Sequence, residues 1–487
     1  MPELPDITSS PLADAMAVWF PVSRESRDGK RSPPGNARAG GRALTLWLRL
    51  AGTRVWLSGE SVSWPGNRPA VRIFRAQLAG RDMLVATLAT DARDTPLQLA
   101  VPIAALAATS SHDLVLRYAG HRVELLVDGV VVDEEWPLGS LRTAEGALQA
   151  GSVDLAAVWD RALTDDELQR LSGGHEGRAD RERRILGPQM SLGQFWSPRG
   201  FNTHVGDCMP FFHAGRFHLF YLFDRNHGLS KWGLGAHQWA HASTTDLVHW
   251  EHHPLAIAIT QESEGSICTG SVFFHAGIYH AYYSVRMADL SASPLCVATS
   301  EDGIHFTKLP PFAYLTSPYK PEPARDPVVF HEEATGRFHL LATTSLADGR
   351  GCLAHLVSPD LQHWEQREPF LIPGLSGEPE CPDTFAWRGW HYLIFSHQGI
   401  AHYRMARSPL GPWQAPAVDT FDGPEAMVMK TAAFTGDRRI GAAVVPPARN
   451  IYAGRVIFRE IIQRADGTLG TKWPPELMPA QLDGVSP

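Results

Sequence analysis

The feature that most constrains the fold of this chain is a short aromatic hairpin pattern that occurs five times. The first copy runs from Gly206 to Tyr221, where apolar residues follow Asp207 on both sides of a turn at Gly215. Apolar runs split by a glycine turn are typical of two short, buried, antiparallel strands. Four more copies follow, at residues 273–283, 330–341, 385–395 and 434–445. Asp207 is therefore expected at the mouth of a sheet.

A second pattern follows each of the first four hairpins in the same register. It reads Ser-Thr-Thr-Asp-Leu-Val-His-Trp at 243–250 and returns in related forms at 299–306, 357–364 and 407–413. A repeat of roughly 50 to 60 residues with about four short strands is typical of a β-propeller, because a single blade cannot bury its own faces. We therefore predict an all-β fold with a five-bladed β-propeller. One large irregular β-sandwich is the alternative, but it leaves two patterns in register to chance.

Length, charge and cysteine content limit the class of protein. The 487 residues have room for two or three domains. A net charge of −8 without a Lys/Arg cluster argues against nucleic acid and anionic membranes as partners. Five cysteines without a CxxC pair favour free thiols in a reducing compartment. Because neither a signal-peptide pattern nor a long apolar run is present, we expect a cytoplasmic protein; a homo-oligomer stays open.

The N-terminal part has its own strand pattern. Residues 121–134 read as two alternating strands joined by the Asp128-Gly129 turn, a strong hairpin signal. A last strand then leads into a short helix that Thr164 can cap. These segments resemble the laminin-G/concanavalin-A-like β-sandwich, a jelly roll, and a packing role is favoured over a sugar or calcium site. The expected domains are the sandwich at 1–172, a linker at 173–190 and the propeller at 191–487.

Three acidic residues stand at matching blade positions. Asp207, Asp326 and Glu380 each precede an inner strand, in blades one, three and four. Inner strands of a propeller converge on its axis, so these side chains are expected in one funnel. Three carboxylates around one concave site suit glycosyl transfer: a nucleophile or base, a proton donor of raised pKa, and a group that offsets the oxocarbenium charge. Each acid alone could equally cap a turn.

Residues 190–475 resemble glycoside hydrolase family 32, the invertase, levanase and inulinase group, and more distantly the five-bladed families 43 and 68. The motifs that carry the resemblance are Trp232-Gly233, Trp239-Ala240-His241-Ala242-Ser243 with Asp246-Leu247-Val248-His249-Trp250, Cys268-Thr269-Gly270-Ser271, Arg325-Asp326-Pro327 and Glu380-Cys381-Pro382-Asp383.

The resemblance implies a retaining hydrolase of fructofuranosyl bonds. Asp207 would be the nucleophile, Glu380 the general acid/base and Asp326 the stabiliser of the developing charge. Arg325 would position Asp326. The Asp207 and Glu380 carboxyl groups would then lie roughly 5 to 6 Å apart.

Further substrate contacts are expected around these acids. His227 and Trp232 belong to an insertion after an inner strand, where an aromatic ring with polar neighbours can stack on a sugar. The remaining candidates are Asp383, Ser271 and Trp239. No cofactor and no metal are expected, since the histidines that flank Trp239 do not form a helix-borne HExxH pattern.

Departures from the family pattern leave the substrate open. The family's NDPNG is here Gly206-Asp207-Cys208-Met209-Pro210, Leu222 replaces a substrate-binding Gln, and the C-terminal β-sandwich is expected to be missing. The leading prediction is hydrolysis of short fructo-oligosaccharides. A fructosyltransferase, a difructose-anhydride-processing enzyme or an arabinofuranosidase-type enzyme is the alternative within the class. A carbohydrate-binding protein without catalysis is the alternative outside it.

Overall fold

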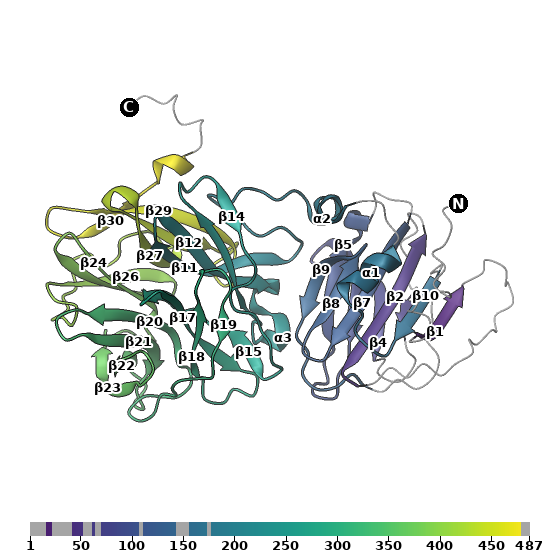
Figure 1. Ribbon diagram of the computed structural model, residues 1–487, viewed down its shortest axis with the longest axis horizontal. Coiled ribbons are helices and arrows are strands. Elements are labelled where there is room, and N and C mark those ends of the chain that lie inside the picture. The colour runs from purple at the N-terminus through teal and green to yellow at the C-terminus, as the bar shows by residue number, and fades with distance from the viewer. Residues whose placement is uncertain are drawn as a thin grey trace. The chain divides into compact units, whose positions relative to one another are not determined.

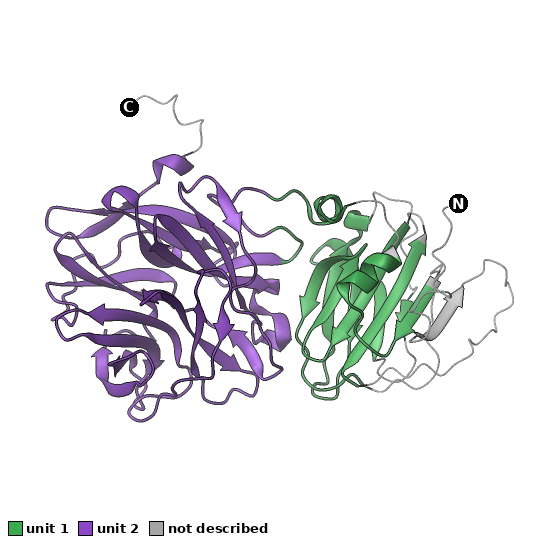
Figure 2. Cartoon of the chain, in the orientation of Figure 1, with its two compact units in different colours: residues 1–189, 199–202 green, residues 190–198, 203–487 purple. Residues whose placement is uncertain are grey.

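The computed structural model describes residues 16–21, 41–51, 61–63, 70–106, 111–142, 155–172 and 177–478. Strands make up most of this part of the chain, which confirms the all-β prediction. The chain divides into two compact units, Met1–Gln189 with Arg199–Asn202, and Met190–Pro198 with Thr203–Pro487 (Figure 2). No helix among the described residues is both long and apolar enough to cross a bilayer.

The first unit contains two antiparallel sheets (Figure 1). The six-stranded sheet has the order β1 (Met16–Pro21), β10 (Leu155–Trp159), β2 (Ala43–Ala51), β7 (Ser111–Ala119), β8 (Val123–Val127) and β9 (Val130–Glu135). The four-stranded sheet consists of β3 (Ser61–Ser63), β4 (Val71–Leu78), β5 (Arg81–Leu88) and β6 (Leu97–Pro102). Helices α1 (Asp165–Ser172) and α2 (Arg178–Leu186) follow, so part of the predicted linker is helical. The laminin-G/concanavalin-A-like assignment stays a prediction.

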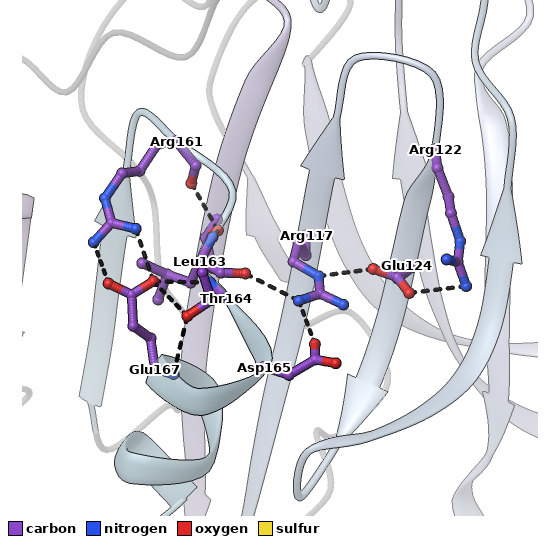
Figure 3. Close-up of polar contacts among 9 residues, drawn as sticks. Arg117, Arg122, Glu124, Arg161, Leu163, Thr164, Asp165 and Glu167 are labelled. Carbon is purple, nitrogen blue, oxygen red and sulfur yellow. Dashed lines mark hydrogen bonds and ion pairs between the residues drawn. The ribbon is translucent and has the colours of Figure 1, made fainter. Parts of the chain in front are cut away.

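Two local predictions in this unit are confirmed. Strands β8 and β9 pair directly around Asp128 and Gly129, whose φ angles of 49° and 76° are those of a tight hairpin turn. Thr164 and Glu167 cap α1 reciprocally: the Thr164 Oγ1 accepts from the Glu167 N–H at 3.3 Å, and the Glu167 carboxylate accepts from the Thr164 N–H at 2.8 Å (Figure 3). Figure 3 also shows Arg117, which joins the helix start to the sheet.

The second unit contains five antiparallel sheets in chain order, the five predicted blades (Figure 1). Blade one is β11 (Thr203–His213), β12 (Arg216–Arg225), β13 (Gln238–Thr244) and β14 (Trp250–His252). Blade two is β15 (Glu264–Ile267), β16 (Ser271–His275), β17 (Ile278–Met287), β18 (Leu295–Ser300) and β19 (Thr307–Lys308). Blade three is β20 (Arg325–Glu332), β21 (Arg337–Ser345), β22 (Gly351–Ser358) and β23 (Glu365–Leu371). Blade four is β24 (Glu380–Trp387), β25 (Trp390–His397) and β26 (Ile400–Ala406). Blade five is β27 (Met427–Phe434), β28 (Arg438–Val445), β29 (Arg455–Gln463) and β30 (Leu469–Lys472).

The ring of blades closes between blade one and blade five. The segment before β11 runs along β29, where Trp196 forms an antiparallel bridge with Val456. Aromatic side chains fill the junction, and the Phe217 and Phe434 rings meet edge to face at 6.0 Å. Backbone pairing and apolar packing therefore both join the two ends of the propeller.

The second sequence pattern builds the outer turns of the blades. Asp246 accepts hydrogen bonds from the Val248 and His249 N–H groups, and its other oxygen lies 2.7 Å from His249 Nδ1. Asp302 with His305 and Asp360 with His363 repeat this geometry at 2.8 Å. These histidines are exposed, and their pairs with the aspartates hold the outer turns.

Candidate active site

Irregular strand pairing at the start of the inner strands sets the direction of the three predicted acidic side chains. The pairing of β11 with β12 shifts register at Asp207, that of β20 with β21 at Asp326, and that of β24 with β25 directly after Glu380. Asp326 and Cys381 have φ angles of 57° and 50°, in the left-handed region. Such bulges redirect a side chain, and left-handed non-glycine residues persist only where their surroundings hold them.

Asp207, Asp326 and Glu380 line one pocket of about 390 Å³ together with Arg325. The structure thus brings the three carboxylates of three different blades into one cavity. Residues of blade two and blade five complete the wall, among them Arg286 and Tyr452.

Asp207 is held through both carboxylate oxygens. Its Oδ2 accepts a hydrogen bond from Thr269 Oγ1 at 2.6 Å and from the Cys381 thiol at 3.5 Å. Its Oδ1 accepts from the Tyr452 hydroxyl at 3.3 Å. Donors on both oxygens fix the orientation of this carboxylate.

Arg325 links the other two acids. Its guanidinium donates to Glu380 Oε1 at 2.8 Å and lies 3.6 Å from Asp326 Oδ2. Asp326 is only 2% exposed, and its Oδ2 also accepts from the Cys381 N–H at 3.0 Å. Arg325 therefore holds its neighbour in sequence and, at the same time, the acid of the next blade.

Burial and crowding of like charges change the proton affinities in the pocket. Burial raises the pKa of Glu380, and the nearby Asp326 and Asp207 add to this, while Arg325 opposes it. Burial likewise raises the pKa of Asp326, with Arg325 opposing and Asp207 adding. Burial also raises the pKa of the Cys381 thiol far above its usual range, so this cysteine is no thiolate nucleophile.

The other predicted contacts separate into two groups. His227 lines the pocket, through η4 (Asn226–Gly228) after β12. Four candidates are not among the residues that line it: Trp232, Ser271, Asp383 and Trp239.

Each of these four side chains lies in a different environment outside the pocket. Trp239 is fully buried in β13 and donates its indole N–H to the Cys268 carbonyl at 2.9 Å, which corrects its prediction as a sugar contact. Asp383 accepts two hydrogen bonds from Thr431 at 2.9 Å and so joins blade four to blade five. Ser271 lies at the start of β16, and Trp232 in the short helix α3 (Ser230–Gly233).

Several pocket residues were not singled out from the sequence. Thr269 stands two residues before Ser271 in the same motif and contacts Asp207 in its place. Tyr452 lies 245 residues from Asp207, in a loop with no repeat pattern. Leu222, which the sequence did mark as the replacement of a substrate-binding Gln, lines the pocket as an apolar residue.

One group beside the pocket has metal-ligand chemistry. His204, Asp224 and His227 each offer one ligand atom, and these atoms lie within 4.8 Å of one another. Burial lowers the pKa of His204 to about 4, so its imidazole is neutral. The expectation of no metal rested on the absence of a helix-borne HExxH pattern around Trp239, and such a pattern does not describe ligands that come from separate strands.

The propeller sequence matches a known family. Residues 208–415, which begin directly after Asp207, match the profile of the "Glycosyl hydrolases family 32 N-terminal domain". This segment is a family 32 glycosyl hydrolase domain. The resemblance predicted from the motifs is thereby confirmed.

Two curated proteins are similar to part of this chain. Sucrose-6-phosphate hydrolase of Escherichia coli is 32% identical over 197 residues, which are 38% of this chain and 39% of that protein. Raffinose invertase of Escherichia coli is 31% identical, covering 38% of this chain and 40% of that protein. The chain thus spans about two fifths of these relatives.

A fructan 1-exohydrolase IIa variant from Cichorium intybus, solved in complex with 1-kestose, superposes with a TM-score of 0.50 at 20% identity. The superposition covers 60% of this chain and 62% of that one. At this identity the likeness concerns the fold of the propeller.

Proposed function

We propose that the propeller hydrolyses β-fructofuranosidic bonds with retention of anomeric configuration. The observation that carries this proposal is that Asp207, directly before the segment that matches family 32, lines one pocket with Asp326 and Glu380, which lie inside that segment. A pocket of about 390 Å³ has room for a small saccharide. Short fructosyl saccharides are the proposed substrates.

Asp207 is proposed as the nucleophile. Its carboxylate accepts hydrogen bonds from Thr269 and Tyr452, which fix the direction of attack. Glu380 is proposed as the general acid, because burial raises its pKa and so keeps its proton to higher pH. Asp326, held by Arg325, is proposed to stabilise the positive charge on the sugar ring.

The proposed reaction has two balanced steps. An Asp207 oxygen forms a bond to the anomeric carbon while the bond to the leaving oxygen breaks and Glu380 gives that oxygen its proton. Ionised Glu380 then takes a proton from water, whose oxygen displaces Asp207 and releases fructose. Two inversions at one carbon give net retention, and they require the two carboxyl groups roughly 5 to 6 Å apart.

Two pocket residues shape the choice of substrate. Leu222 presents an apolar surface where the family pattern has a Gln, so one polar sugar contact is absent from that wall. Arg286 adds a cation to the same pocket. Sucrose, raffinose and sucrose 6-phosphate, suggested by the names of the relatives, are therefore the first compounds to compare, together with 1-kestose and inulobiose.

The experiment measures reducing-sugar release from these compounds by wild type and three variants. Glu380→Gln should lose about 10²–10⁴-fold in kcat, the usual contribution of general acid catalysis, and Asp207→Asn at least as much. Glu365→Gln is the matched control, since it removes an exposed carboxylate of β23 that pairs with Arg367 and does not line the pocket. Early NMR spectra should show the retained anomer.

Four outcomes would contradict the proposal. Release of the inverted anomer would exclude the covalent step, and full activity in folded Asp207→Asn would exclude the nucleophile. Sugar binding without turnover by wild type would favour the binding-protein alternative. Products larger than the substrate would assign the chain to fructosyl transfer instead of hydrolysis.

A further inference from the structure

His204, Asp224 and His227 meet on one face of blade one, beside the pocket. His204 in β11 and Asp224 in β12 are direct partners in the antiparallel register, so their side chains point to the same side of the sheet. His227 follows three residues after Asp224 in η4, and its ring stacks on that of His204 with centroids 3.7 Å apart. Among the described residues, this is the one group of three or more His, Cys, Asp or Glu side chains whose ligand atoms converge.

The hydrogen bonds around the group leave ligand atoms available. His227 Nδ1 lies 2.9 Å from the Tyr452 carbonyl, to which it can only donate, so Nε2 carries the lone pair. Asp224 is fully buried, and its Oδ1 accepts from the Gly228 N–H at 2.6 Å and lies 3.0 Å from His237 Nε2. Its Oδ2 is also buried and has no hydrogen-bond partner among the described residues.

A buried carboxylate oxygen without a partner is costly, so a cation next to it would be stabilising. A sugar in the pocket does not supply the partner, since Asp224 is fully buried and does not line the cavity. Two imidazoles and one carboxylate are a ligand set that zinc and similar divalent transition metals prefer. The bonds of His227 to Tyr452 and of Asp224 to His237 are of the kind that orient metal ligands from outside.

We propose that His204, Asp224 and His227 bind one divalent transition-metal ion of the zinc type, with water completing the coordination. Metal–ligand bonds of about 2.0–2.1 Å place tetrahedral donors about 3.4 Å apart. The three atoms, now within 4.8 Å, must therefore close by up to about 1.4 Å, by rotation of the imidazole rings. The site is independent of the proposed sugar chemistry.

The ion would join two strands to a strained part of the pocket wall. Asn226 and His227 have left-handed φ angles of 56° and 54°, and His227 and Gly228 line the pocket. Bonds from the metal to His227 would hold this conformation against relaxation. The role assigned to the metal is thus structural, separate from the three catalytic carboxylates.

The test titrates ZnCl2 into the full chain after removal of metals with a chelator, using isothermal calorimetry. One equivalent should bind to wild type, and the Kd should rise at least about tenfold in His204→Gln and in His227→Gln. The matched control is His249→Gln, which removes a histidine paired with an exposed aspartate and should leave the titration unchanged. Co2+ in place of Zn2+ should give a visible ligand-field spectrum in wild type that His204→Gln lacks.

Folding of each variant is checked by circular dichroism and thermal unfolding. Zinc should raise the unfolding temperature of wild type and of His249→Gln, but not that of His204→Gln. The proposal is overturned if wild type binds no stoichiometric zinc. It is equally overturned if binding is the same in His204→Gln and His227→Gln, which would mean an adventitious ion only. The cobalt spectrum of wild type decides the matter even if a variant fails to fold.

Discussion

The hydrogen bond from Thr269 to Asp207 offers a quantitative test of the proposed nucleophile. Thr269→Val keeps the shape of a side chain that is 1% exposed and removes the donor that lies 2.6 Å from Asp207 Oδ2. A hydrogen bond to an ionised group contributes about 1.5–3 kcal/mol, and 1.36 kcal/mol is tenfold in rate. If that bond fixes the direction of attack, kcat should fall by roughly 10- to 150-fold.

Tyr452→Phe supplies a graded comparison on the other oxygen. Its bond of 3.3 Å is longer than the usual range for a hydroxyl donor, so a loss of about 0.5–1 kcal/mol, or roughly two- to fivefold, is expected. Because both donors hold one carboxylate, the effects in the double variant should not add.

The assay is the initial rate of sugar release, resolved into kcat and KM, with the thermal midpoint as a check on folding. Thr431→Val is the matched control, since it removes a similar threonine bond to Asp383, which does not line the pocket. The control should change stability but keep kcat within about twofold. A folded Thr269→Val enzyme with the kcat of wild type, or with an effect confined to KM, would refute the reasoning.

Three further predictions concern acidity, leaving group and packing. Arg325→Gln removes the neighbour that lowers the pKa of Glu380, so this pKa should rise further. Because Glu380 must be protonated to act, the alkaline limb of the kcat/KM profile should move to higher pH. A shift of that limb to lower pH would contradict the assignment. Glu380→Gln should recover much of its rate on fructosyl fluoride, whose leaving group needs little protonation, as measured by fluoride release; equal losses on fluoride and sucrose would argue against an acid role. Gly270→Ala would place a Cβ 1.8 Å from the Tyr282 carbonyl oxygen and should cost about 3 kcal/mol or more, whereas Gly193→Ala, with open space around it, should stay within about 0.5 kcal/mol in denaturant unfolding.

The blade hairpins were predictable because their information is local. A period-two apolar pattern and a glycine turn specify a hairpin within about 12 residues. Gly215 and Gly277, with φ angles of 79° and 85°, lie in such turns. Repetition then implies the ring, since each blade needs a neighbour to cover its faces.

The side chains of the pocket were only partly predictable, because their contacts depend on pairing between distant strands. Asp207, Asp326 and Glu380 could be placed together, since blade starts gather at the axis. Tyr452 could not, because no local pattern connects a loop residue to a carboxylate 245 positions away. The bulges were equally hidden: nothing in the composition around Asp326 requires its φ of 57°.

Trp239 shows why a motif residue can be predicted as a sugar contact although its side chain is buried. An aromatic residue beside a rim insertion fits sugar stacking and core packing equally well, and sequence periodicity does not separate them when a strand is buried on both faces. Every residue of β13 is buried. Its indole N–H therefore needs an internal acceptor, and the Cys268 carbonyl of blade two supplies it. Cys268 precedes Thr269 directly, so the tryptophan supports the segment that carries the Asp207 donor through its packing and its indole hydrogen bond.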